Sequence, residues 1–212
     1  MRGSFRTSVV LSNEDYTLLK QGLLTPDGCE NFAVLFCGAA RGNGWSRLLT
    51  RELWHAPRDA YQQRLPYHLE VAPAFFNRVV DHCLAQKLHP VVTHSHPASG
   101  RALYSPSDDF GESRLLRVLK QLLPWTTPGS LLVTPSDTGG RLYEDGRLIN
   151  LERIEVRGLE SRTFTVSPLT PLNSIDESRY DRQIRAIGDR GQRALDGLRA
   201  GDRKSTRLNS SH

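Results

Sequence analysis

The chain has few cysteines and no pattern that would use them together. It contains three, Cys29, Cys37 and Cys83, which is an odd number without Cys-x-x-Cys spacing. That arrangement argues against a disulfide framework and favours buried thiols in a reducing compartment. Near Met1 there is no apolar core of a signal peptide, and no apolar run is long enough to span a membrane. We therefore expect a cytoplasmic protein that does not act on membranes.

Two other patterns are missing, and each excludes a class of ligand. Although the formal net charge is +5, lysine and arginine are scattered among acidic residues and form no basic run of five or more. We therefore expect no nucleic-acid partner. The glycines of residues 38–44 lack the Gly-Lys-Ser/Thr ending of a phosphate loop, so we expect a hairpin turn there. The 38% hydrophobic content suits one compact domain of moderate size.

The strongest chemical pattern is Thr93-His94-Ser95-His96-Pro97, which follows the apolar run 90–92. Side chains alternate along a strand, so two histidines one residue apart face the same side and can bind one ion. Asp108 can add a carboxylate oxygen from the start of the next helix. Three protein ligands leave a fourth position for water, which is the arrangement of catalytic zinc sites.

Each part of this pattern also has an ordinary structural explanation. A lone His-x-His pair is more often structural or incidental than metal-binding. The segment 105–108 is also a good helix start, with Ser105 as the N-cap, Pro106 at the first helical position and the acidic Asp108 at the third. Asp109 stays open as an alternative ligand because it is adjacent to Asp108.

The combined spacing, His94-x-His96-Pro97 and then Ser105-x-x-Asp108, resembles the JAMM motif of the JAB/MPN metalloproteases. The resemblance implies one zinc ion per chain and hydrolysis of a peptide or isopeptide bond after the C-terminus of a ubiquitin-like or sulfur-carrier protein. It also implies the site residues, with Glu30 as general base, Ser105 as oxyanion donor, and His94, His96 and Asp108 as zinc ligands. One departure is Ala33, where the family usually has glycine.

The order of expected helices and strands, together with the resemblance, predicts an α/β fold over residues 8–166. Its sheet is expected to be of the JAB/MPN type, mixed but largely antiparallel, and flanked by helices. The continuous apolar run 32–37 suits a buried strand, and 45–55 suits its return strand. Apolar residues at helical spacing predict helices after Pro73 and past Asp108. The polar stretch 58–66 is expected to be a loop.

The remainder of the chain differs in kind. Its composition makes residues 167–175 a linker. Residues 176–200, with Arg179-Tyr180-Asp181-Arg182-Gln183, resemble the opening helix of the ThiF/MoeB/E1 adenylyltransferases, which activate ubiquitin-like proteins. Residues 202–212 have no apolar periodicity and resemble a translated sequencing-library adapter. We therefore expect a C-terminal helical extension that begins a truncated second domain, followed by a non-native tail.

The sequence leaves two other functions open. An inactive MPN-type scaffold would only bind partners, but such proteins typically lose metal ligands, and His94, His96, Asp108 and Glu30 are all present here. A RadC-like DNA-associated protein has a similar histidine segment, but it would be accompanied by a helical DNA-binding region, for which the sequence gives no sign.

Overall fold

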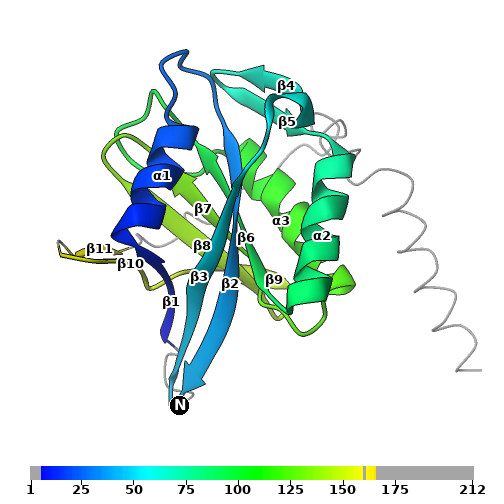
Figure 1. Ribbon diagram of the computed structural model, residues 1–212, viewed down its shortest axis with the longest axis vertical. Helices are drawn as coiled ribbons and strands as arrows, with labels where there is room; N and C mark the ends of the chain where they lie inside the picture. The colour runs from blue at the N-terminus through cyan, green and yellow to red at the C-terminus, as the bar shows by residue number, and fades with distance from the viewer. Residues whose placement is uncertain (1–5, 160, 166–212) are drawn as a thin grey trace, which may run out of the picture.

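Strands make up most of the regular structure in the computed structural model, which describes residues 6–159 and 161–165 (Figure 1). One sheet has the order β11-β10-β1-β3-β2-β6-β7-β8-β9. Its parallel pairs are β1–β10, β1–β3 and β6–β7, and its other pairs are antiparallel. The strands β4 and β5 form a separate hairpin. The strand bounds are β1 (Arg6–Ser12), β2 (Phe32–Gly42), β3 (Trp45–His55), β4 (Tyr61–Leu65), β5 (His68–Val71), β6 (His89–Ser95), β7 (Gly129–Val133), β8 (Thr138–Glu144), β9 (Arg147–Asn150), β10 (Arg153–Arg157) and β11 (Arg162–Thr165).

The fold class expected from the sequence, a JAB/MPN-type sheet flanked by helices, was wrong. Strands account for 44% of the structure and helices for 28%, and the nine-stranded sheet curls into a half-barrel. Part of the error lies at residues 58–66, where the expected loop contains β4. Another part is β11, which had no expected counterpart and pairs with β10. Both strands depend on pairing with a neighbour rather than on a local apolar pattern.

Three α-helices of the described chain lie against the sheet: α1 (Asn13–Leu23) on one face, and α2 (Pro73–Gln86) and α3 (Pro106–Leu122) on the other (Figure 1). A 3₁₀ turn, η1 (Arg58–Ala60), precedes β4. Proline opens both α2 and α3, as expected for a residue whose missing N–H is not needed in the first turn. None of these helices is long and apolar enough to cross a membrane.

The strand β2 separates two apolar clusters. Its first six residues are all buried, as the continuous apolar run predicted. Alternate side chains reach opposite faces, with Phe32, Val34 and Phe36 packing beside α2 and α3, and Ala33, Leu35 and Cys37 packing beside α1. The observed register of β2 against β6, in which Phe32 pairs with His94, positions the candidate site.

The three cysteines are free thiols, and Cys37 and Cys83 are buried, as expected. Burial raises the pKa of each of these two thiols to about 12. Thiols with such a high pKa are poor nucleophiles and poor metal ligands at neutral pH, so both belong to the core. Cys29 is of intermediate exposure.

Several boundaries expected from the sequence lie outside the described residues. These are the linker at 167–175, the helical segment at 176–200, the tail at 202–212 and the end of the first domain at 166. The expected C-terminal helical extension and the ThiF-like resemblance fall in the same part of the chain.

Candidate metal centre

The end of β6 brings two imidazoles together. This strand lies between β2 and β7, and all seven of its residues are buried. His94 and His96 are two positions apart, and both side chains point to the face that carries α3. The Nε2 atom of His94 lies 3.4 Å from Oδ1 of Asp108, and the Nε2 atom of His96 lies 3.4 Å from Oδ2. The two histidines and the aspartate expected from the sequence therefore converge on one point.

Asp108 is held in place by a capping box at the start of α3. The Ser105 hydroxyl accepts the backbone N–H of Asp108 at 3.2 Å, and Oδ2 of Asp108 accepts the backbone N–H of Ser105 at 2.7 Å. The same hydroxyl donates to Oδ2 at 2.7 Å and lies 2.8 Å from the hydroxyl of Ser107. The capping explanation of this segment is thus confirmed, and the cap also aims the Asp108 carboxylate at the histidines.

Glu30 reaches the same point because β2 and β6 are antiparallel. Phe32 pairs with His94, so the residues just before β2 lie beside the residues just after β6. The backbone N–H of Ser95 donates to the carbonyl of Asn31, which extends the pairing by one step. As a result, Oε1 of Glu30 lies 3.6 Å from Nε2 of His96. The side chain is buried, and that burial raises its pKa, although the two histidines act in the opposite direction.

The electrostatics of the cluster are dominated by carboxylates around buried imidazoles. Burial by itself would lower the pKa of His94, but Asp108 and Glu112 outweigh it and raise the pKa to about 10. Burial would likewise raise the pKa of Asp108, but His94 and His96 hold it well below its usual range. The carboxylates of Asp108 and Glu112 therefore stabilise positive charge at His94.

Three of these residues could together hold a metal ion. Within the described ranges, His94, His96 and Asp108 each offer one ligand atom, and all three atoms lie within 4.8 Å of one another. Two atoms about 2.0–2.1 Å from a tetrahedral ion lie roughly 3.3 Å apart, close to the two nitrogen–oxygen separations of 3.4 Å. The buried Nε2 atom of His94 makes no hydrogen bond among the described residues, and a metal bound to it would take the place of a ring proton. Two imidazoles and one carboxylate are a donor set that zinc commonly takes.

A second group of polar residues behind His94 was missed by the sequence reasoning. Oε1 of Glu112 lies 3.3 Å from Nδ1 of His94. Oε2 of Glu112 accepts from the Ser130 hydroxyl at 2.6 Å and from Nε of Arg141 at 2.7 Å. Arg141 also forms an ion pair with Asp109. Asp109, kept open as an alternative ligand, is therefore turned towards the arginine and away from the histidines.

One local signal could have indicated Glu112. It follows Asp108 by four residues in α3, and residues four apart share a helix face, so the two carboxylates point the same way. The partners in β7 and β8 carry no such signal, because their proximity depends on how α3 packs on the sheet. Arg141 lies in the middle of a strand whose first six residues are buried.

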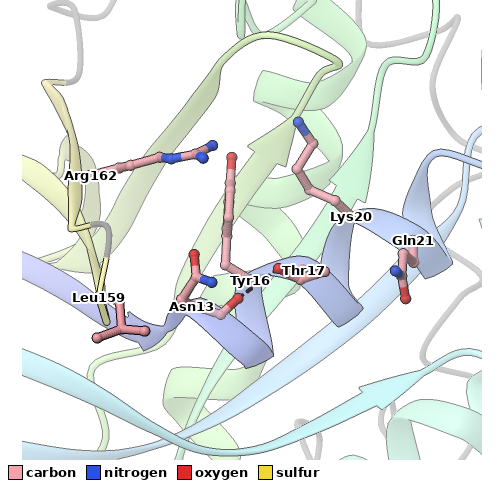
Figure 2. Close-up of a pocket in the computed structure, with 7 residues that line it drawn as sticks. All are labelled: Asn13, Tyr16, Thr17, Lys20, Gln21, Leu159 and Arg162. Atoms are coloured by element: carbon pink, nitrogen blue, oxygen red, sulfur yellow. Dashed lines mark hydrogen bonds between the residues drawn. The ribbon is translucent and has the colours of Figure 1, made fainter.

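A cavity of about 440 Å³ lies on the other face of the sheet, between α1 and β11 (Figure 2). Tyr16 and Lys20 reach into it from α1, and Arg162 reaches in from β11. Burial, together with the charge of Arg162, lowers the pKa of Lys20, whose ammonium donates to the carbonyl of Pro135 at 2.7 Å. The cavity contains none of the site residues expected from the sequence, and it is separate from the candidate metal centre.

Comparisons with known proteins leave the function open. No family model matches the chain, and no curated protein matches it. The chain is similar to the solution structure of protein DSY2949 from Desulfitobacterium hafniense, with 14% sequence identity and a TM-score of 0.44, over 70% of this chain and 92% of that chain. A similarity at this level assigns no function. The resemblances to JAB/MPN metalloproteases and to ThiF/MoeB/E1 enzymes stay predictions.

Proposed function

We propose that this chain is a zinc-dependent peptidase of the JAMM type. The observation that carries the proposal is the convergence of His94, His96 and Asp108 on one point beside the buried carboxylate of Glu30. Metal-assisted hydrolysis of an amide requires metal ligands and a neighbouring general base, and these residues are of the types that take those two roles. The proposal rests on this geometry and on the motif spacing, and it makes no use of the fold class.

Zinc would be held by His94, His96 and Asp108, and when bound it would supply Lewis acidity and a water whose pKa is about 7. Glu30 would take the proton of the attacking water. Its carboxylate lies beside His96, and its raised pKa suits a group that must both accept a proton and return it. Glu30 would then protonate the leaving amine.

Ser105 would stabilise the oxyanion that develops on the scissile carbonyl. Its hydroxyl donates to Asp108 in this structure, so the role requires the hydroxyl to turn towards the substrate while the neighbouring Ser107 hydroxyl remains within hydrogen-bond reach. A donor of this kind is worth about 3 kcal/mol of transition-state stabilisation. The backbone half of the capping box would keep Asp108 in place when the hydroxyl turns.

The substrate class follows from the resemblance alone. We propose a ubiquitin-like or sulfur-carrier protein, cleaved after its C-terminal Gly-Gly at a peptide or isopeptide bond. The ThiF-like resemblance of residues 176–200 associates the chain with enzymes that activate such proteins, and it supports this substrate class. A cytoplasmic location is part of the proposal, and three free thiols support it.

The test separates metal binding from turnover. Elemental analysis should find one zinc per chain in the wild type and in Glu30→Gln, and none in the double variant His94→Ala/His96→Ala. A ubiquitin-like protein extended beyond Gly-Gly should be cleaved by the wild type alone. Absence of zinc from the wild-type protein would return the histidines to a structural role and favour a binding scaffold. Undiminished cleavage by Glu30→Gln would refute Glu30 as the base.

A further inference from the structure

His94 is contacted through both of its ring nitrogens, and only one of them faces the candidate metal centre. Nε2 points to Asp108, whereas Nδ1 points away from the cluster towards Glu112. Two buried atoms, Oε1 of Glu112 and Nε2 of His94, make no hydrogen bond among the described residues. One arrangement satisfies both atoms: a metal bound to Nε2 and a proton on Nδ1 that is donated to Glu112.

Glu112 is itself fixed by groups that only donate to it. Its other oxygen, Oε2, accepts from the Ser130 hydroxyl at 2.6 Å and from Nε of Arg141 at 2.7 Å. All three residues are buried, and Arg141 and Ser130 are fully so. A carboxylate with two donors on one oxygen can turn only slightly, so the other oxygen remains opposite His94.

Arg141 also distinguishes the two neighbouring aspartates. One side of its guanidinium pairs with Asp109 and another with Glu112, while its face lies 3.7 Å from the centre of the Tyr104 ring. These two ion pairs of the guanidinium hold Asp109 away from the histidines, so that Asp108 is the carboxylate that faces them. A lysine could neutralise the same charge, but it could not bridge two carboxylates in fixed directions.

We propose that Glu112 and Arg141 are positioning residues of the metal site, with Glu112 orienting His94 for metal binding and Arg141 orienting Glu112 and Asp109. This inference rests on the proposed function, because it assumes that His94 is a metal ligand. A histidine that binds a metal commonly donates its other N–H to a carboxylate, which fixes the ring and increases its basicity. Loss of such a partner typically lowers metal affinity about 10- to 100-fold.

The first test is Glu112→Gln. Ser130 and Arg141 can donate only to the amide oxygen, so the NH₂ group of the glutamine would face Nδ1 of His94. Nδ1–H would then meet a donor instead of an acceptor, and the ring would lose the arrangement in which Nε2 is free for the metal. We expect zinc affinity, measured by competition with a chromophoric chelator, to fall about 10- to 100-fold. The visible absorption spectrum of the cobalt-substituted protein should also change, since it reports the geometry of the ligands.

Two controls separate positioning from stability. Glu52→Gln removes the carboxylate from another histidine, since Oε2 of Glu52 lies 3.1 Å from Nε2 of His82 on the α2 side of the sheet. Leu116→Ala removes a fully buried side chain from the same helix as Glu112 and should destabilise the protein. Both controls should bind zinc as tightly as the wild type and give its cobalt spectrum. If Glu112→Gln does not fold, Glu112→Asp serves instead, since it keeps the charge beside Arg141 but withdraws the carboxylate from His94.

The outcomes distinguish this inference from the proposed function. Wild-type protein that binds no zinc would overturn both. Zinc bound by the wild type, with affinity and cobalt spectrum unchanged in Glu112→Gln or in Glu112→Asp, would overturn the positioning role and leave the peptidase proposal standing. Arg141→Lys adds a graded test, because one ammonium can keep only one of the two carboxylates in place. Its zinc affinity should lie below that of the wild type.

Discussion

The guanidinium of Arg64 donates to the side-chain carbonyl of Asn31, with Nε 2.8 Å from Oδ1, and so ties the β4–β5 hairpin to the residue after Glu30. Other nitrogens of the same side chain reach Asp27 at 2.7 Å and Thr25 at 3.0 Å. The backbone N–H of Glu30 donates to the carbonyl of Leu65 in the same hairpin. The segment that carries the proposed base is therefore held from outside the sheet by the β4–β5 hairpin, through Arg64 and the carbonyl of Leu65.

This relationship predicts a change in turnover without a change in metal content. In Arg64→Met the aliphatic stem remains but the hydrogen bonds of the guanidinium to Thr25, Asp27 and Asn31 are lost, so Glu30 is less precisely placed. We expect kcat to fall about 10- to 100-fold, as for other misplaced catalytic groups. Zinc stoichiometry should stay that of the wild type, because His94, His96 and Asp108 are untouched.

The matched control is Arg78→Met. Arg78 belongs to α2, away from the site, and its guanidinium lies over the ring of Trp54 in β3. This substitution should leave kcat unchanged. Equal activity of Arg64→Met and Arg78→Met would show that the hairpin has no part in placing Glu30.

A second prediction concerns acid stability and does not involve the metal centre. Burial lowers the pKa of His89, and the charges of Arg41 and Lys120 add to the effect. Its Nδ1 accepts the backbone N–H of Thr127 at 2.9 Å, which only the neutral ring can do. The unfolded chain therefore binds this proton more readily than the folded one. The free energy of unfolding should decrease as pH falls below about 6.5 towards the lowered pKa.

Urea denaturation at several pH values between 7.5 and 5.5 measures this dependence. In His89→Asn the amide oxygen can still accept from Thr127, but nothing titrates at this position, so the decrease with pH should be shallower. His55, whose pKa is also lowered by burial, titrates in both proteins and cancels in the difference. Parallel pH profiles for the two proteins would exclude His89 as the source.

A third prediction tests how α1 sits on the sheet. Leu19 is fully buried in the cluster on that face, whereas its neighbour Leu18 is 47% exposed. Leu19→Ala should lower the free energy of unfolding by about 2–5 kcal/mol, because it removes buried methyl groups and leaves a cavity. Leu18→Ala should change it by less than about 0.5 kcal/mol. Similar effects of the two substitutions in chemical denaturation would contradict this orientation of the helix.

The parts of the molecule that the sequence predicted are those with a local signal. Alternation along an extended chain placed His94, in β6, and His96, just after it, on one side, and cap residues placed the start of α3 at Ser105. Apolar residues at helical spacing identified α2, and Asp145 with Gly146 marked the turn between β8 and β9, where both have positive φ.

The parts it missed depend on contacts between distant segments. The strand β4 is polar because it belongs to an outlying hairpin, and only its pairing with β5 makes it a strand. The contact of Glu112 with Arg141 joins residues 29 positions apart. Nor did any local pattern show that strands would dominate the fold or that the sheet would curl, since both depend on the order in which the strands pair.

The last prediction uses two serines that cap helices in the same way. Ser12 accepts the backbone N–H of Asp15 at the start of α1, and Ser105 accepts that of Asp108 at the start of α3. Each hydroxyl also donates to the aspartate side chain. Replacing either serine by alanine should therefore cost about 1 kcal/mol of stability through the lost cap.

Only Ser105→Ala should affect catalysis, because its aspartate is the proposed zinc ligand and its hydroxyl the proposed oxyanion donor. We expect kcat to fall about 10²- to 10³-fold in Ser105→Ala, and to stay within about twofold of the wild type in Ser12→Ala. Zinc affinity measured on the same proteins divides the two roles. A loss of kcat at unchanged affinity indicates oxyanion stabilisation, whereas a parallel loss of affinity indicates that Ser105 acts by orienting Asp108. Equal kcat in the two variants would reduce Ser105 to a helix cap.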